Sequence, residues 1–97
     1  MTDQVHVHGV GSVRIVYASW VMRLVPSRFV GITLNRTIHL RGKHLPVWLL
    51  RHEVQHVRQW HRYGRIGFLV RYLWQCARYG YTNAPLEIEA RAAERGT

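Results

Sequence analysis

Five consecutive residues near the middle of the chain, His52-Glu53-Val54-Gln55-His56, form an H-E-x-x-H string. On an α-helix, residues four apart lie on one face, one turn above the other. Two imidazoles placed in this way can bind one zinc ion, and the glutamate beside the first histidine can then move a proton on a water at that ion. The string predicts His52 and His56 as metal ligands and Glu53 as a general base. The alternative is a pair of solvated histidines on an amphipathic helix.

A third ligand must come from elsewhere, because a catalytic zinc ion normally has three protein ligands and one open position. The chain contains only five acidic residues, and Glu53 is the only one between Asp3 and Glu87. Three of the five are clustered near the C-terminus: Glu87, Glu89 and Glu94. A second helix over residues 84–95 would carry these carboxylates and complete a site of two histidines and one glutamate, with Glu87 and Glu89 both open as the ligand.

Hydrophobic periodicity predicts three helices in the second half of the chain. Pro46 suits a first helical turn and Gly64 suits a helix end, so the string lies inside one helix. A helix over residues 66–78 follows. We expect four residues to form its inner face: Leu69, Tyr72, Leu73 and Cys76. The last helix begins near Ala84-Pro85, with Asn83 or Thr82 as its cap.

The first half of the chain is less regular. Residues 1–12 are polar and resemble a flexible lead-in, which leaves a single domain over residues 13–97. Apolar residues from Val13 to Leu24, at three- and four-residue spacing, predict a further helix that Ser12 would cap.

A change of pattern follows that helix. Residues 29–34 and 37–40 are rich in β-branched side chains, which predicts either a short hairpin or one bent strand. The expected fold class is α+β, with four helices and a small β-hairpin or edge strand.

Composition excludes several classes of protein. With 97 residues, of which 47% are hydrophobic, the chain can fold as one small domain with its own core. It has no run of about 18 apolar residues that could cross a membrane. Its N-terminus lacks the apolar segment of a secretory signal, so we expect a cytoplasmic protein. A chain of this size with four tryptophans could also form a homo-oligomer.

The formal net charge of +9 raises the question of a nucleic-acid or membrane partner. The arginines are scattered along the chain, which is more typical of a solvated surface than of a nucleic-acid interface. Aromatic residues and arginines are mixed between residues 65 and 79, as they are in helices that lie on membranes. We interpret this segment as a helix packed on the core with its arginines outside.

The string and the later carboxylate helix together resemble one family of enzymes. Residues 51–60 (RHEVQHVRQW) and 83–90 (NAPLEIEA) look like the active helix and the glutamate helix of small, single-domain gluzincin metallopeptidases, the minigluzincin-like proteins. The resemblance implies a minimal zincin-like catalytic core. It also implies a zinc ion held by His52, His56 and Glu87.

The family's glutamate helix carries the ligand, an alanine three residues later, and often an aspartate after that. Glu87 and Ala90 match this pattern, whereas Arg91 stands where the aspartate would be. That aspartate usually orients a ligand histidine. Glu89 is the rival ligand, although residues two apart point to different sides of a helix. We interpret Glu94 as a surface charge.

The resemblance implies zinc-dependent hydrolysis of a peptide or protein substrate. The strand within residues 29–40 would line the cleft, where a peptide can pair with its edge. Glu53 would take a proton from water as it attacks the peptide carbonyl and would pass it to the leaving amine. The oxyanion donor is left open among four residues: Tyr63, Tyr79, Tyr81 and His39. Two other functions stay open: a zinc-binding protein of this fold that is non-catalytic or self-inhibited, and a basic nucleic-acid-binding module.

Overall fold

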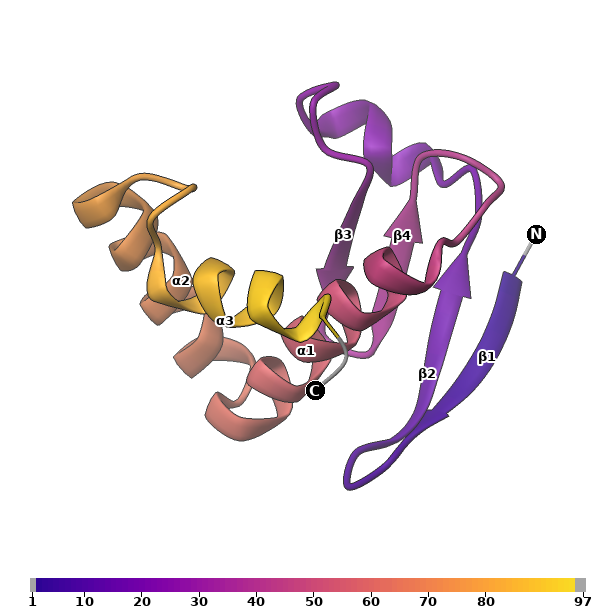
Figure 1. Cartoon of the computed structure of the whole chain (residues 1–97), viewed down its shortest axis with the longest axis horizontal. Helices are drawn as coiled ribbons and strands as arrows, with labels where there is room; N and C mark the ends of the chain where they lie inside the picture. Colours follow the sequence, from indigo (N-terminus) through magenta and orange to yellow (C-terminus); the bar gives the residue numbers. More distant parts are fainter. Residues whose placement is uncertain (1, 96–97) are drawn as a thin grey trace.

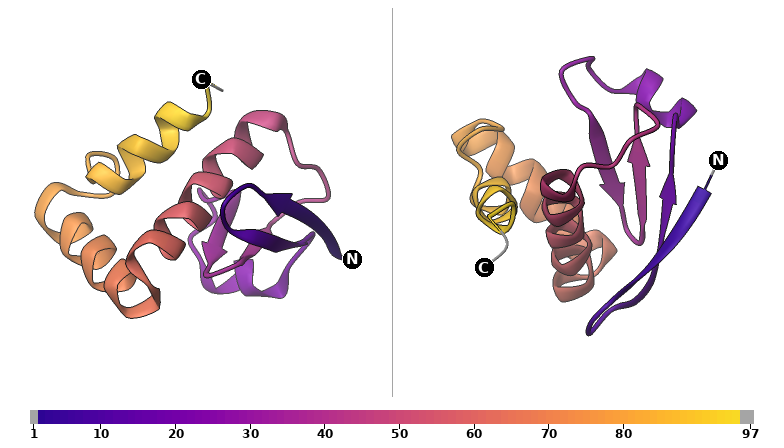
Figure 2. Two further views of the ribbon diagram at one scale, coloured as in Figure 1. Left: turned by 90° about the horizontal axis from the view of Figure 1, so that it is seen from below. Right: turned by 45° about the vertical axis from the view of Figure 1, so that its right-hand side comes forward.

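The computed structural model describes residues 2–95 as an α+β domain in which one small sheet packs against helices. The strands are β1 (Thr2–Val7), β2 (Gly11–Val16), β3 (Gly31–Leu34) and β4 (Thr37–Leu40). The α-helices are α1 (Val47–Tyr63), α2 (Arg65–Tyr79) and α3 (Pro85–Ala93), and a 3-10 helix, η1, spans Trp20–Leu24. Helix α1 lies between the sheet on one side and the α2–α3 pair on the other (Figures 1 and 2).

The four strands are arranged in the order β1-β2-β4-β3. Strands β1 and β2 pair antiparallel, as do β3 and β4, and the two hairpins join through a parallel pairing of β2 with β4. The prediction for residues 29–40 is therefore settled in favour of the hairpin. Its turn uses Asn35 at a φ of 57°, a left-handed conformation that asparagine tolerates better than most residues. The outcome leaves β3 at the edge of the sheet, next to α1.

The prediction for the N-terminal part was wrong. The lead-in and the helix after it are replaced, over the described residues from 2 onward, by β1, β2 and η1. Val13 and Ile15 point into the core while Ser12 and Arg14 do not, which is the two-residue period of a strand. β-Branched residues favour such a half-buried strand over a helix. Ser12 lies within β2 and caps nothing; Ser19 caps η1 by accepting a hydrogen bond from the backbone N–H of Val21.

Two hydrophobic clusters hold the helices in place. The larger one joins the inner face of the sheet to α1 through seven buried residues: Val7, Val13, Ile15, Ile38, Leu40, Leu49 and Val57. The smaller one joins the three helices through Trp60, Phe68 and Leu86. Because α1 contributes to both clusters, it is held against the sheet on one side and against α2 and α3 on the other.

The helices of the second half lie close to where the sequence places them. Gly64, at a φ of 76°, separates α1 from α2, and its N–H bonds to the carbonyl oxygen of Trp60. Pro85 opens α3, but neither Asn83 nor Thr82 caps it, because the N-cap position falls on Ala84. Among the described residues there are three α-helices rather than four, with η1 as an additional short 3-10 helix. None of these helices is long and apolar enough to cross a membrane.

Helix α2 differs from the prediction in its orientation. Phe68 is its only fully buried residue, and Tyr72 and Cys76 are partly buried. Leu69 and Leu73, which were expected on the inner face, are 42% and 64% exposed. The inner face of α2 is thus set one position away from the expected one, and an apolar face is left in solvent.

We predict that Ile15→Ala destabilises the protein by about 2–5 kcal/mol. Ile15 is 1% exposed, so the substitution removes buried methyl groups and leaves a cavity between the sheet and α1. Urea denaturation followed by circular dichroism measures the loss. Ile66→Ala is the matched control, because Ile66 is 79% exposed and its replacement should change stability by less than about 0.5 kcal/mol. Equal stability of the two variants would refute the assignment of residues 11–16 to the core.

Candidate metal centre

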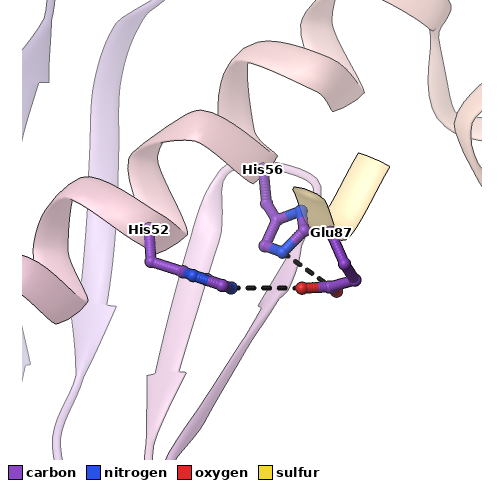
Figure 3. Close-up of side chains that lie close together, drawn as sticks. All are labelled: His52, His56 and Glu87. Carbon is purple, nitrogen blue, oxygen red and sulfur yellow. Dashed lines mark hydrogen bonds and ion pairs between the residues drawn. The ribbon is translucent and has the colours of Figure 1, made fainter. Parts of the chain in front are cut away.

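Helices α1 and α3 bring the H-E-x-x-H string and the acidic cluster together. His52 and His56 lie one turn apart on the same face of α1, and Glu87 faces them from the first turn of α3 (Figure 3). Nε2 of His52 is 3.2 Å from Oε1 of Glu87, and Nε2 of His56 is 3.1 Å from Oε2 of Glu87. The side chains of His52, His56 and Glu87 are 11%, 8% and 3% exposed, so the cluster is largely excluded from solvent.

The arrangement fits a tetrahedral metal ion. The three residues each offer one ligand atom, and these atoms all lie within 4.8 Å of one another. Ligands about 2.0–2.1 Å from a tetrahedral zinc ion are separated by about 3.4 Å. The observed contacts between the imidazole nitrogens and the carboxylate are close to that separation. Two histidines and one carboxylate also leave a fourth position open, as in catalytic zinc sites.

Each histidine has a second hydrogen bond that fixes its ring. Nδ1 of His52 lies 2.7 Å from Oε2 of Glu94, and Nδ1 of His56 lies 2.8 Å from Oε1 of Gln59. With Nδ1 donating to an oxygen, Nε2 becomes the metal-facing atom on both rings. Such partners orient histidine ligands and raise their basicity in metal sites.

Glu94 is the first functional residue that the sequence prediction missed. It is not a free surface charge, because its carboxylate accepts the hydrogen bond from His52. It lies seven residues after Glu87, which is two helical turns, so both carboxylates face α1; this spacing was the available signal. Glu94 thus gives His52 the carboxylate partner that the resemblance implied for an aspartate at position 91, while the Arg91 side chain bonds to the carbonyl oxygen of Thr82.

Gln59 is the second missed residue, and its hydrogen bonds involve Glu89, the rival of Glu87. It is fully buried; besides accepting from His56, its amide donates to the carbonyl oxygen of Leu86 and to Glu89. Glu89 also accepts from Gln55 and therefore points along the side of α1 away from the His52–His56 pair. Glu89 is not in the cluster that could hold a metal ion, whereas Glu87 is.

Tyr72 of α2 completes the surroundings of Glu87. Its hydroxyl donates to Oε2 of Glu87 over 2.5 Å, and its ring stacks on Phe68. Burial and the bond to Glu87 raise the pKa of Tyr72 well above its ordinary value, so the hydroxyl keeps its proton. Tyr72 was not among the four expected oxyanion donors. Of those four, only Tyr81 lines the pocket beside the cluster.

Glu53 is buried beside the cluster and is held by the edge strand. Its Oε1 accepts a 2.8 Å hydrogen bond from the hydroxyl of Thr33 on β3. Burial raises its pKa, although the charges of His56 and His52 and the Thr33 bond oppose the rise. A carboxylate with a raised pKa is a better proton acceptor near neutral pH than an ordinary glutamate.

The charges of the cluster are strongly coupled. Burial would disfavour protonation of His52 and His56, but hydrogen bonds to Glu87 outweigh it and raise the pKa of both. Burial would likewise raise the pKa of Glu87, yet the same bonds hold it well below its usual range. Glu87 is therefore an ionised carboxylate, which is the form that binds a metal.

An apolar pocket of about 310 Å³ opens beside the cluster. Its floor contains His52, Glu53, His56 and Glu87, and residues 31–34 of the edge strand form one wall. Phe68, Leu69 and Leu73 of α2 also line it, as do Val25 and Phe29. The pocket gives a ligand access to the open position of the candidate metal centre.

We predict that Glu94→Ala weakens zinc binding by about 10–100-fold, because His52 loses the partner that orients it. Competition with a chromophoric chelator measures the affinity. Glu94→Gln should lose less zinc affinity, since the amide oxygen of the glutamine can still accept the hydrogen bond from Nδ1 of His52. Arg95→Ala, at the exposed neighbouring position, should leave the affinity unchanged. Wild-type affinity in Glu94→Ala would remove Glu94 from the site.

Comparison with protein-family models, curated proteins and solved structures finds no match to this chain.

Proposed function

We propose that this chain is a zinc-dependent peptide hydrolase of the gluzincin type, with His52, His56 and Glu87 as zinc ligands and Glu53 as the general base. One observation carries the proposal. The Nε2 atoms of both histidines lie 3.1–3.2 Å from the carboxylate oxygens of Glu87, while both Nδ1 atoms are held by oxygen acceptors. Two accidental surface histidines would not need polar partners on both ring nitrogens.

Zinc, when bound, supplies a Lewis acid that polarises a carbonyl and lowers the pKa of a water to near 7. The side chains of the protein hold the water and transfer its proton. Glu53 accepts the proton of the attacking water and later gives it to the leaving amine. The Thr33 hydroxyl holds Oε1 of Glu53, which keeps the carboxylate beside His52 and His56 in one rotamer.

The edge strand β3 supports a peptide as the substrate. One side of β3 pairs with β4, and no described strand pairs with the other side. Residues 31–34 also line the pocket, so an extended peptide that pairs with β3 would place a carbonyl near Glu53. The apolar walls favour a substrate with an aliphatic or aromatic side chain beside the scissile bond.

The deciding experiment combines zinc content with cleavage. The protein is purified with zinc supplementation, its metal is measured by elemental analysis, and it is incubated with a peptide library read by mass spectrometry. We expect about one zinc per chain and cleavage beside apolar residues. Zinc without cleavage would favour a non-catalytic or self-inhibited zinc protein, and a protein without zinc would overturn the proposal.

A further inference from the structure

Helix α2 presents a continuous apolar arc to solvent. At about 100° per residue, its exposed side chains cover about 140° of the helix circumference without a polar residue between them. These side chains are Ile66, Leu69, Val70, Leu73, Trp74 and Ala77, and the first five are 42–79% exposed. Figure 2 (left) shows α2 at the edge of the helical layer, and the exposed fractions of these side chains show that no described element covers them. A surface of this kind normally marks an interaction site.

The charge around this arc has a single sign. Arg71 and Arg78 border it, Arg65 precedes it, and the sequence between Glu53 and Glu87 contains no acidic residue. The guanidinium of Arg71 lies 4.5 Å from the ring centroid of Tyr63, which holds this charge at the border of the arc. The matching partner is therefore apolar at its centre and negative around it.

A second exposed apolar segment lies at η1, next in the chain to a residue that lines the pocket. Trp20 and Leu24 of η1 are 68% and 76% exposed, and Val25, next in the chain, lines the same pocket as Leu69 and Leu73. Val25 thus joins the η1 segment to the pocket that α2 also lines.

We propose that this chain binds the surface of membranes containing anionic lipids, through the outer face of α2 assisted by η1. An aliphatic arc with tryptophan, bordered by arginines, has the composition of helices that lie in the membrane interface. Each arginine near an anionic surface strengthens such binding roughly fivefold. The binding does not depend on the metal centre, so the inference holds whether or not the protein hydrolyses peptides.

Two other occupants fit less well. A second copy of the chain would bring arginine-bordered faces together, and neither copy has a carboxylate on α2 to pair with them. A nucleic acid would leave the aliphatic arc exposed, since arginines lie at its border and not at its centre.

Co-sedimentation of the full chain with vesicles tests the proposal. We expect binding to mixed phosphatidylcholine–phosphatidylglycerol vesicles at about 50 mM salt, at least tenfold weaker binding to pure phosphatidylcholine, and release at about 1 M salt. The wild-type protein alone shows whether the chain binds anionic membranes. Absence of binding to the anionic vesicles would overturn the proposal, and so would binding that is insensitive to both lipid charge and salt.

Matched variants locate the surface. Ile66→Ser with Val70→Ser, and separately Arg71→Gln with Arg78→Gln, should each reduce vesicle binding at least tenfold with unchanged circular dichroism. The controls are Val47→Ser with Ile88→Ser and Arg14→Gln with Arg58→Gln, which alter exposed residues on other elements. Equal losses in variants and controls would overturn the assignment to α2. A wild-type dimer in light scattering that the α2 variants convert to a monomer, without vesicle binding, would show a second copy as the occupant.

Discussion

Glu53→Gln should reduce peptide cleavage by about 10²–10⁴-fold while leaving about one zinc per chain, the loss typical of a missing general base. Glutamine has nearly the same shape as glutamate, and its amide oxygen can still accept the hydrogen bond from Thr33, so the packing around the site should persist. The amide cannot accept a proton from water, which removes only the chemical step. Initial rates on a fluorogenic peptide from the library screen measure the effect, and elemental analysis measures the zinc.

Gln55→Ala is the control for this substitution. Gln55 lies within the same five-residue string, but it bonds to Glu89 and does not line the pocket. Its replacement should change cleavage by no more than a few-fold. If Glu53→Gln keeps wild-type activity with zinc bound, Glu53 is not the general base and the proposed hydrolytic mechanism is wrong. The assignment of the metal ligands would be unaffected.

Removal of zinc should lower the melting temperature by about 10–20 °C relative to protein with free zinc at about 100 times the dissociation constant. A ligand at that concentration stabilises the folded state by about 2.7 kcal/mol. For a domain of 60–100 residues, each kcal/mol corresponds to about 4–8 °C. The physical reason is that the unfolded chain does not hold the α1 histidines next to Glu87. Melting curves by circular dichroism, with chelator and with zinc, measure the shift.

Glu87→Ala should abolish most of this zinc-dependent shift, because two histidines alone bind zinc far more weakly than three ligands. Magnesium is the metal control: it prefers octahedral oxygen ligands and should produce no shift in the wild-type protein. A melting temperature of the wild-type protein that changes with neither chelator nor zinc would contradict the assignment of His52, His56 and Glu87 as ligands.

The helices of the site could be predicted because their signals are local. The helical spacing of apolar residues and the glycine at position 64 define α1, and this alone puts His52 and His56 on one face. The scarcity of carboxylates then pointed to α3 as the source of a third ligand. The class of site, a pair of histidines facing a glutamate, thus follows from residue types and spacing.

The N-terminal strands could not be predicted in the same way. Residues 13–24 contain apolar residues at spacings that suit either a helix or a strand, and the helix was the wrong choice. The strand conformation is stabilised by pairing of β2 with β4, more than twenty residues later in the chain. Such non-local pairing leaves no signal in a short window of sequence.

By itself the sequence determined the chemistry that this protein can offer: two histidines one turn apart, a glutamate between them and a helix that carries the remaining acids. Only the tertiary structure decided toward which partner each of these carboxylates points. The packing of Leu86 and Gln59 between α1 and α3 turns Glu87 toward the histidines, Glu94 toward Nδ1 of His52 and Glu89 away from both. The same packing leaves the apolar face of α2 in solvent. A helix presents all its side chains, and the direction from which its neighbour approaches selects the ones that meet.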